Sequence, residues 1–183
     1  MLLGNYFYNI RKDYKDLSFS GISFNTKNIK KKNIFFAIKG NNFDGNKFIS
    51  IAIKKGCKII VTEKKVKQIQ NGILYIHTKN IRKLLAETAF KIYNKIPKNL
   101  ISVTGTNGKS SVADFYYQIL NLNNKNVASI GTLGVKSKIF NLNLSNTTID
   151  PVKLGQLLTR LKNQKIENII MEASSHGLKQ NRL

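Results

Sequence analysis

Cysteine is almost absent from this sequence of 183 residues. The single one, Cys57, cannot form a disulfide within the chain, and no second cysteine offers the spacing of a metal site. No apolar run approaches the roughly 20 residues of a membrane-spanning helix. Residues 1–16 lack the basic and then apolar layout of a secretory signal. These absences disfavour a disulfide-stabilised or membrane-inserted protein and predict a cytoplasmic one.

Acidic residues are also scarce, with nine Asp and Glu against 31 Lys and Arg, and the net charge of +22 suggests nucleic-acid binding. However, 27 of the basic residues are lysine, and they are spread among many Asn and Ile residues whose codons are AT-rich. Nucleic-acid readers favour arginine and cluster it on one face. We therefore attribute the charge to genome composition and expect no nucleic-acid partner, although the surface should attract phosphate-bearing ligands.

The first segment, residues 1–97, has the apolar patterns of a small α/β domain, and 42% hydrophobic residues favour a globular fold. Strands are predicted at residues 33–40, 57–63 and 72–78, and helices at residues 46–56 and 81–94. Gly56 should end the first helix. The pattern breaks at Pro97, which we predict as the domain boundary.

The second segment, residues 98–183, alternates strand and helix. Strands are predicted at residues 100–104, 126–130 and 167–173, a hairpin near 135–144, and helices at 109–122 and from Pro151 onward. Asp150 is a good N-cap for the last helix, and Pro151 suits its first position. Such alternation predicts a parallel sheet with crossover helices. The strands are too few for a complete sheet of this kind, so we expect a truncated domain.

A phosphate-binding loop is predicted at Gly105–Ser110, "GTNGKS", between a strand and a helix. Backbone N–H groups there can bind phosphate oxygens, Lys109 can reach the terminal phosphates and the Ser110 hydroxyl can ligate Mg²⁺. A full Walker A motif needs a glycine where Val103 stands, so this is a compact version. A glycine-rich turn with a stray lysine is the alternative, and the flanking strand and helix disfavour it.

Two further polar clusters follow predicted elements, "NTTID" at residues 146–150 and "MEASSHGLKQNR" at residues 171–182. The first, taken alone, is an ordinary helix-capping segment. In the second, Glu172 ends a buried strand opposite the loop serine and resembles a second Mg²⁺ ligand. His176 alone suggests a structural histidine, and a Ser-His-acid hydrolase is disfavoured because no G-x-S-x-G turn is present.

In this order, "TGTNGKSS", "SIGTLGV", "NTTID" and "MEASSHGLKQNRL" resemble the Mur ligase family, and most of all its MurE type, the UDP-N-acetylmuramoyl-tripeptide synthetases. The run "NTKNIKKKNIFFAIKGNNFDGNKFISIAIKKGCKIIV" is similar to the UDP-binding domain of these enzymes. The resemblance covers nearly the whole chain. It implies a small N-terminal α/β UDP-binding domain, then the first part of a P-loop-type parallel-sheet ATPase domain.

The resemblance implies an ATP-dependent amide-bond ligase of peptidoglycan synthesis that acts as a cytoplasmic monomer. ATP would phosphorylate the D-Glu carboxylate of UDP-MurNAc-L-Ala-D-Glu, and a diamino acid, meso-diaminopimelate rather than L-lysine, would attack the acyl phosphate. Lys109 would be catalytic, because it neutralises the transferring phosphoryl group. The family's carbamylated lysine, a further metal-binding histidine and a C-terminal domain follow the position of Arg182. We therefore expect no ligase activity from these 183 residues alone.

The family's functional residues map onto this sequence by motif. The ATP-binding residues would be Gly105, Thr106, Asn107, Gly108, Lys109, Ser110 and Ser111. The Mg²⁺ ligands would be Ser110 and Glu172. The substrate contacts would be Thr26, Asn41, Asn42, Phe43, Asn146, Thr147, Thr148, Ser174, Gln180 and Arg182. The family's Asp-Ser-Arg is Asn25-Thr26-Lys27 here, and this loss of a carboxylate bears on the affinity for UDP.

Three alternatives remain open. The first is a sister ligase of the MurF or folylpolyglutamate synthase type, which "SSHGLKQNR" disfavours. The second is a basic nucleic-acid-binding module with an incidental P-loop. The third is a decayed reading frame that folds poorly.

Overall fold

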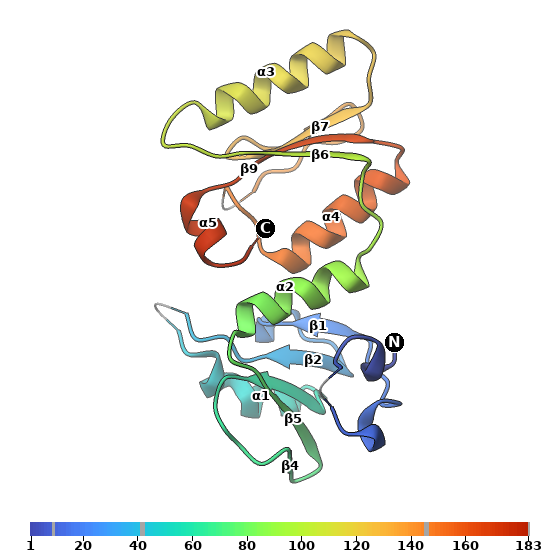
Figure 1. Ribbon diagram of the computed structural model, residues 1–183, viewed down its shortest axis with the longest axis vertical. Coiled ribbons are helices and arrows are strands. Elements are labelled where there is room, and N and C mark those ends of the chain that lie inside the picture. Colours follow the sequence, from blue (N-terminus) through green and yellow to red (C-terminus); the bar gives the residue numbers. More distant parts are fainter. Residues whose placement is uncertain (9, 41–42, 145–146, 183) are drawn as a thin grey trace. The chain divides into compact units, whose positions relative to one another are not determined.

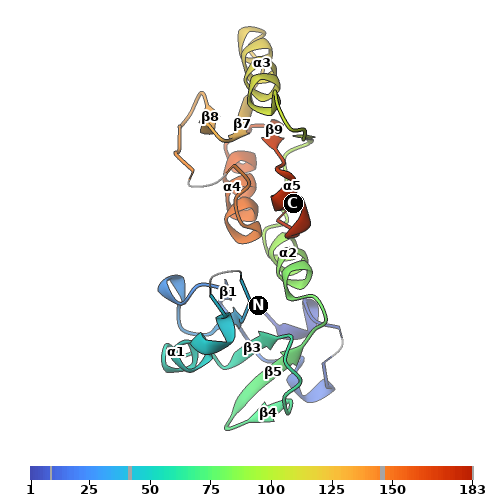
Figure 2. The same cartoon turned by 90° about the vertical axis from the view of Figure 1, so that its left-hand side faces the viewer.

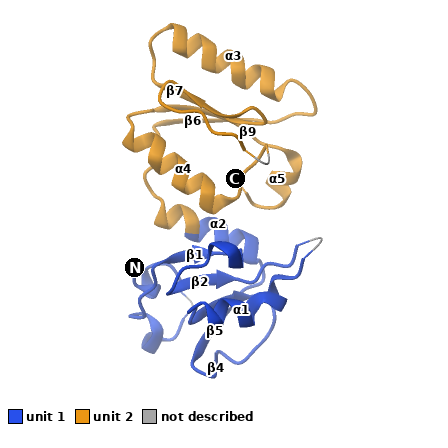
Figure 3. Cartoon of the chain, turned by 180° about the vertical axis from the view of Figure 1, so that it is seen from behind, with its two compact units in different colours: residues 1–88 blue, residues 89–183 orange. Residues whose placement is uncertain are grey.

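The computed structural model describes residues 1–8, 10–40, 43–144 and 147–182 (Figure 1). The chain divides into two compact units, Met1–Thr88 and Ala89–Leu183 (Figure 3). The division falls within helix α2, Ile81–Ile92. The boundary that the sequence predicts near Pro97 lies beyond this point and stays a prediction.

Unit 1 is built on a five-stranded sheet in the order β1-β2-β3-β5-β4. Its strands are β1 Gly21–Ser23, β2 Asn33–Phe36, β3 Ile59–Thr62, β4 Ile69–Gln70 and β5 Ile73–His77. All neighbouring strands pair in parallel except β4 and β5, which are antiparallel. The predicted strands match β2, β3 and β5, whereas β1 and β4 are too short to give a periodic signal.

The helical segments of unit 1 are short except for α2. They are the 3₁₀ turns η1 Leu3–Asn5, η2 Lys12–Tyr14, η3 Thr26–Asn28 and η4 Gly45–Phe48, and the helices α1 Ile49–Lys54 and α2. The helix predicted over residues 46–56 is therefore a 3₁₀ turn followed by α1. Gly56 follows the C-cap of α1 at φ +91°, so a glycine ends this helix as predicted, because a side chain is strained in that conformation.

The core of unit 1 lies on both faces of its central strands, because all four residues of β2 and of β3 are buried. One cluster joins Phe35 and Ile60 to Ala52 of α1 and to Cys57. Such continuous apolar runs are typical of parallel strands covered on two sides. Burial raises the pKa of the Cys57 thiol to about 11, so the thiol is protonated and unreactive at neutral pH.

Unit 2 contains a four-stranded sheet in the order β6-β9-β7-β8. Its elements are β6 Asn99–Val103, α3 Lys109–Leu122, β7 Val127–Gly131, β8 Gly134–Ser137, α4 Pro151–Asn163, β9 Asn168–Glu172 and α5 Ser175–Lys179. Strands β6, β9 and β7 are parallel, and β8 returns antiparallel to β7. The sheet lies between α3 and α4 (Figure 2). The predicted α/β fold with parallel sheets is confirmed.

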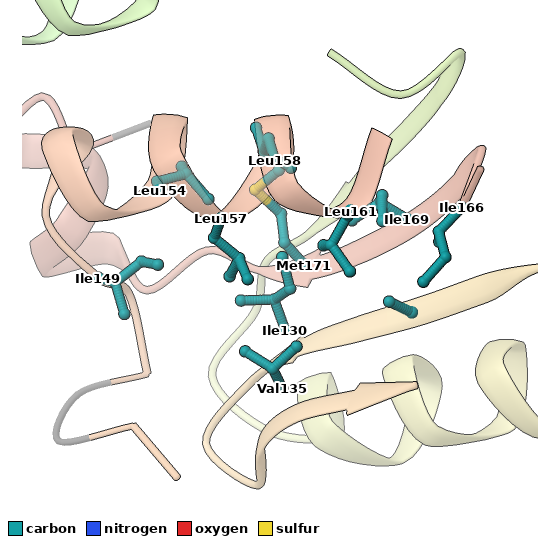
Figure 4. Packing of buried hydrophobic residues seen from close by; sticks show 11 residues of the cluster. Ile130, Val135, Ile149, Leu154, Leu157, Leu158, Leu161, Ile166, Ile169 and Met171 are labelled. Atoms are coloured by element: carbon teal, nitrogen blue, oxygen red, sulfur yellow. The ribbon is translucent and has the colours of Figure 1, made fainter. Parts of the chain in front are cut away.

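The core of unit 2 lies between α4 and the sheet (Figure 4). The buried stripe of α4 is the predicted one, Leu154, Leu157, Leu158 and Leu161. It packs on Ile130 of β7 and on Ile169 and Met171 of β9. Asp150 caps the helix by accepting a hydrogen bond from the Lys153 N–H at 2.9 Å. Each buried leucine contributes about 1.5–3 kcal/mol, so this face anchors the sheet.

The opposite side of the sheet is less covered. Ala113 and Tyr117 are the buried residues of α3. Its other side leaves an exposed apolar stripe of Val112, Phe115, Ile119 and Leu122. The edge strand β6 is exposed along most of its length. The main apolar core of unit 2 is therefore on the α4 side.

In the part of the chain that the structure describes, no helix combines the length and the apolar character needed to cross a membrane.

Candidate nucleotide-binding site

The candidate site lies where three parallel strands of unit 2 end together. Val103 of β6 pairs with Glu172 of β9, and Ile130 of β7 pairs with Met171, one residue before Glu172. The segments after β6, β7 and β9 therefore leave the sheet at the same edge. Open α/β sheets bind ligands at this edge, outside the carboxyl ends of their strands.

The loop after β6 presents the amino end of α3. Gly108 is the N-cap of the helix at φ +77°, and no side chain caps the first turn. A Cβ atom at Gly108 would meet nothing within 4 Å, so glycine is favoured there by backbone conformation rather than by space. The uncapped N–H groups of the first turn and the positive end of the helix dipole are suited to binding an anion.

Lys109 lies folded over this loop. Its ammonium Nζ donates hydrogen bonds to the Gly105 carbonyl oxygen at 2.6 Å and to the Thr106 carbonyl oxygen at 3.3 Å. An ammonium has three N–H donors, so one is left over after these two bonds. The loop therefore holds a positive charge beside the uncapped helix end, where a bound phosphate would need it.

Ser110 and Glu172, the predicted Mg²⁺ ligands, are in direct contact. The Ser110 hydroxyl donates to Glu172 Oε2 at 3.0 Å. The Glu172 side chain comes from the end of β9 and is only 3% exposed. In the described part of the chain, no ion pair includes Glu172. A buried carboxylate without a cationic partner is costly, so the site fits a bound cation.

The donor set also fits magnesium. Hydroxyl and carboxylate oxygens are hard ligands, and Mg²⁺ at nucleotide sites uses one or two carboxylates together with phosphate oxygens and water. Among the described residues, no group of three His, Cys, Asp or Glu side chains gathers around a common point. A cation at Ser110 and Glu172 would therefore depend on the nucleotide for part of its coordination.

A second polar cluster joins the segment before α4 to the one after β9. Thr148 Oγ1 accepts a hydrogen bond from the Ser174 N–H at 3.0 Å, and the two hydroxyl oxygens are also 3.0 Å apart. Arg182 Nη1 donates to the Thr148 carbonyl oxygen at 2.9 Å, and Nε donates to Gln180 Oε1 at 3.0 Å. Four of the predicted substrate contacts therefore lie together in the structure.

Glycine makes this cluster possible. A Cβ atom at Gly177 of α5 would lie 2.6 Å from Thr148 Cγ2 and 2.8 Å from Thr148 Oγ1. The Gly177 N–H donates to Ser174 Oγ at 3.0 Å, which makes Ser174 the N-cap of α5. The short helix can thus pack directly on the Thr148 side chain.

His176 does not form a hydrolase triad. Its Nε2 lies 2.7 Å from Gln180 Nε2, and its side chain is exposed. Ser174 bonds to Thr148 and to the Gly177 N–H. In the described contacts no serine hydroxyl reaches the imidazole, so the geometry does not favour the hydrolase alternative.

Two of the predicted ligand residues of unit 1 are described, Thr26 and Phe43, and no printed contact joins these two into a comparable network. Thr26 lies in η3, and its carbonyl oxygen accepts a hydrogen bond from Lys55 Nζ at 2.7 Å. Phe43 is 73% exposed. The remaining candidates, Asn41 and Asn42 of unit 1 and Asn146 of unit 2, lie outside the described residues. The UDP site therefore stays a prediction.

Thr132 is a residue of the candidate site to which the sequence motifs assigned no role. It occupies the loop between β7 and β8, and its N–H and its hydroxyl donate to Glu172 Oε1 and Oε2 at 2.9 and 3.0 Å. Gly131, directly before it, packs so closely against the Glu172 carboxylate that a Cβ atom would overlap it. The sequence signal for Thr132 is the run "SIGTLGV", which contains it and resembles the family, although no residue of the run was given a role.

An ion pair between α3 and β8 was not predicted from the sequence. Lys136 Nζ lies 2.7 Å from Asp114 Oδ1 and 5.4 Å from the centre of the Tyr117 ring. Hydrogen bonds from Lys136 and Gln118 lower the pKa of Asp114. The pair links the helix that carries Ser110 to the hairpin that carries Thr132.

Two models of known protein families match most of this chain. The model described as "Mur ligase family, catalytic domain" matches residues 18–98, and the model "Mur ligase middle domain" matches residues 103–183. UDP-N-acetylmuramoyl-L-alanyl-D-glutamate--2,6-diaminopimelate ligase from Rickettsia conorii is 42% identical over 182 residues, covering 96% of this chain and 37% of the relative. The enzyme of that name from Brucella melitensis is 37% identical over 168 residues, covering 92% and 34%.

Solved structures show the same fold. A structure of UDP-N-acetylmuramoyl-L-alanyl-D-glutamate--2,6-diaminopimelate ligase superposes with a TM-score of 0.81 at 24% identity, over 100% of this chain and 38% of that one. MurF ligase from Thermotoga maritima in complex with ADP gives a TM-score of 0.53 at 22% identity, over 84% and 32%. The chain thus spans about a third of the length of these relatives, from 32% to 38%.

Proposed function

Because this chain belongs to the Mur ligase family, matched by two of its models over residues 18–98 and 103–183, we propose that it provides the nucleotide-binding parts of an ATP-dependent amide-bond ligase. The substrate would be UDP-MurNAc-L-Ala-D-Glu and the added group meso-diaminopimelate, as the names of its relatives indicate. We place the reaction in peptidoglycan precursor synthesis in the cytoplasm, and we expect a monomer.

One observation carries the proposal. The Ser110 hydroxyl lies 3.0 Å from the buried carboxylate of Glu172, beside the uncapped end of α3. Glu172 accepts hydrogen bonds but has no cationic partner in the described structure, so its negative charge would repel a phosphate bound beside it unless a cation lay between the two. Magnesium bound to ATP supplies such a cation and neutralises phosphate charge, with Ser110 and Glu172 as its protein ligands.

The residues of this chain fit the phosphorylation of a carboxylate. A carboxylate is a poor electrophile until one of its oxygens becomes part of a phosphate leaving group. The transferring phosphoryl group carries developing charge on its oxygens, and catalysis consists mainly of positioning and neutralising that charge. Lys109 and the N–H groups after Gly108 would bind these oxygens. The ammonium group and the positive end of the helix dipole lie at the same loop.

The cluster of Thr148, Ser174, Gln180 and Arg182 would hold the muramoyl-peptide. Hydroxyl, amide and guanidinium groups are present together, and Arg182 is already fixed by bonds to Gln180 and to the Thr148 carbonyl. A guanidinium binds carboxylates with two parallel hydrogen bonds. The peptide's carboxylates are the groups that this arrangement could orient.

Nucleotide binding by the 183-residue chain is the first test. A fluorescent ATP analogue is titrated in the presence of Mg²⁺ against the wild-type chain and against Lys109→Ala. Hydrogen bonds to charged groups contribute about 1.5–3 kcal/mol, so we expect Lys109→Ala to weaken binding by roughly 10- to 100-fold. Lys125→Ala is the matched control, because Lys125 is an exposed lysine just beyond the other end of α3 and should leave binding unchanged.

The outcome also separates the alternatives. Nucleotide binding that is lost in Lys109→Ala supports the proposal. No nucleotide binding, combined with salt-dependent DNA binding that survives Lys109→Ala, would favour the nucleic-acid module instead. We expect the 183 residues alone to form no amide bond, and a tripeptide product from ATP, the dipeptide substrate and diaminopimelate would contradict this expectation.

A further inference from the structure

Thr132 fixes both oxygens of the Glu172 carboxylate. The backbone N–H of Thr132 donates to Oε1 at 2.9 Å, and its hydroxyl donates to Oε2 at 3.0 Å. A carboxylate otherwise rotates about its last side-chain bond, which has a broad energy profile. Two bonds from a single residue, one to each oxygen, restrict that rotation.

The same hydroxyl reaches a second threonine. Thr132 Oγ1 lies 3.0 Å from Thr147 Oγ1, and Thr147 comes from the segment before α4. A hydroxyl has one proton, and an ionised carboxylate only accepts hydrogen bonds. Because the Thr132 proton goes to Glu172, the proton between the two threonines must come from Thr147. The result is a directed chain from Thr147 through Thr132 to Glu172.

The two carboxylate oxygens of Glu172 accept different numbers of hydrogen bonds. Oε2 accepts from both Ser110 and Thr132. Among the described contacts, Oε1 accepts only the Thr132 N–H. A carboxylate oxygen has two lone pairs, so Oε1 keeps one that points to no described donor.

We infer that Thr132 is a positioning residue: it holds Glu172 so that the remaining lone pair of Oε1 serves the cation, and it links that carboxylate to Thr147. The inference rests on the proposed function, because it assumes that Mg²⁺ accompanies the nucleotide. Residues behind a metal ligand fix its orientation, and their loss weakens metal binding even though they never touch the metal.

Conservative substitutions isolate this role. Thr132 is exposed, so Thr132→Val removes the hydroxyl without changing side-chain shape or a buried core. Its backbone N–H, and thus the bond to Oε1, stays in place. Thr132→Ser keeps the hydroxyl and removes only a methyl group. A structural effect of lost packing would appear in the serine variant, whereas a positioning effect would appear in the valine variant.

The matched control is Thr159→Val in α4. The Thr159 hydroxyl is buried and has no hydrogen-bond partner in the described structure. The control thus makes the same chemical change in the same unit without breaking a hydrogen bond. Thr147→Val tests the other half of the chain, since it removes the donor to Thr132 and leaves the bonds of Glu172 intact.

The experiment measures how much Mg²⁺ improves the affinity for the fluorescent ATP analogue, by titrating each variant in Mg²⁺ and in EDTA. We expect Thr132→Val to reduce the Mg²⁺ enhancement by about 10-fold, the lower end of the range for residues behind a metal ligand, because the N–H bond remains. The affinity in EDTA should be unchanged. Thr132→Ser should retain most of the enhancement, Thr147→Val should lose a smaller part of it, and Thr159→Val should match the wild type.

Two results would overturn the inference alone. One is a wild-type enhancement in Thr132→Val, and the other is a loss in Thr132→Ser as large as in Thr132→Val. A wild-type chain that binds the analogue no better in Mg²⁺ than in EDTA would overturn this inference together with the proposed Mg²⁺ site. Thermal unfolding of each variant confirms that the compared chains are folded.

Discussion

The two units present their candidate ligand residues in different ways. In unit 2, Ser110, Thr132 and Glu172 come from three separate segments and meet through hydrogen bonds of 2.9–3.0 Å. In unit 1, Thr26 and Phe43 lie on a 3₁₀ turn and on a loop, and Phe43 is 73% exposed. Among the described residues of unit 1, no buried residue carries a charge, whereas unit 2 contains the buried carboxylate of Glu172.

The difference follows from strand register. The carboxyl ends of neighbouring parallel strands lie at the same edge of the sheet. Residues that directly follow such strands are therefore brought close together. Ser110, Thr132 and Glu172 lie at or just beyond the ends of such strands, because β6 and β7 both pair in parallel with β9. The two described candidates of unit 1, Thr26 and Phe43, instead follow the short strands β1 and β2, in a 3₁₀ turn and in a loop. Residues at paired strand ends are thus positioned by the fold, whereas turn residues depend on local conformation.

The largest effect is expected from Gly131→Ala, which tests whether the convergence in unit 2 is required. The new methyl group would overlap the Glu172 carboxylate and displace it from Thr132 and Ser110. Overpacking costs about 1–3 kcal/mol of stability, and we expect binding of the ATP analogue in Mg²⁺ to fall below detection. Binding is measured by fluorescence titration and stability by urea unfolding.

Gly72→Ala in unit 1 is the comparison. A Cβ atom there meets nothing within 4 Å, but the residue has φ +73°. We expect a loss of about 1 kcal/mol from backbone strain and unchanged nucleotide binding. Equal loss of binding in both variants would show that the close approach of Gly131 to Glu172 has no special importance.

Matched truncations of the two cores should affect stability and leave the binding residues in place. Leu158 in α4 and Ile60 in β3 are both buried, with exposures of 1% and 0%. Replacing either with alanine leaves a cavity and should cost about 2–5 kcal/mol. The loss of unfolding free energy is measured by urea unfolding, with hydrogen exchange used to follow each unit separately.

Cys57 provides an independent probe of unit 1. Its thiol is buried and its pKa is raised to about 11, so a thiol reagent should modify it only after unit 1 opens. Ile60→Ala should therefore speed the modification at a urea concentration where the wild type is slow. Rapid modification of the folded wild-type chain would contradict the buried position of Cys57.

The smallest effects concern acid stability. Hydrogen bonds from the Lys162 side chain and the Lys98 N–H lower the pKa of Glu167 in unit 2, and hydrogen bonds from Asn46 lower the pKa of Asp44 in unit 1. A carboxyl group with a lowered pKa stabilises the fold above its ordinary pKa. This stabilisation is lost as the pH falls through the lower, folded-state value.

Glu167→Gln and Asp44→Asn should therefore lower the urea midpoint slightly at pH 7. Each difference from the wild type should shrink below about pH 4, where these groups begin to be protonated in the unfolded chain. Urea unfolding at several pH values measures the difference. A gap that persists at pH 2 would show that the amide variants disturb packing rather than remove a charge.

Much of the fold could be predicted from local patterns. Helix α3 begins and ends at the predicted residues, and the leucine stripe of α4 is the buried one. Both rest on a 3.6-residue period sustained over several turns. Strand β1 was missed because three residues carry no period, and β4 because its two residues are exposed. Its pairing depends on β5, which a local pattern does not record.

The sequence by itself determined which residue types the candidate site contains: the predicted phosphate loop at Gly105–Ser110, a carboxylate at Glu172 and the motifs that carry the family resemblance. These are properties of residue type and spacing. Only the tertiary structure decided that Thr132 holds that carboxylate and that Gly131 makes room for it. Contacts between residues 40 positions apart depend on strand order and register, and the hydrogen bonds at Glu172 exist only once β7 and β9 pair.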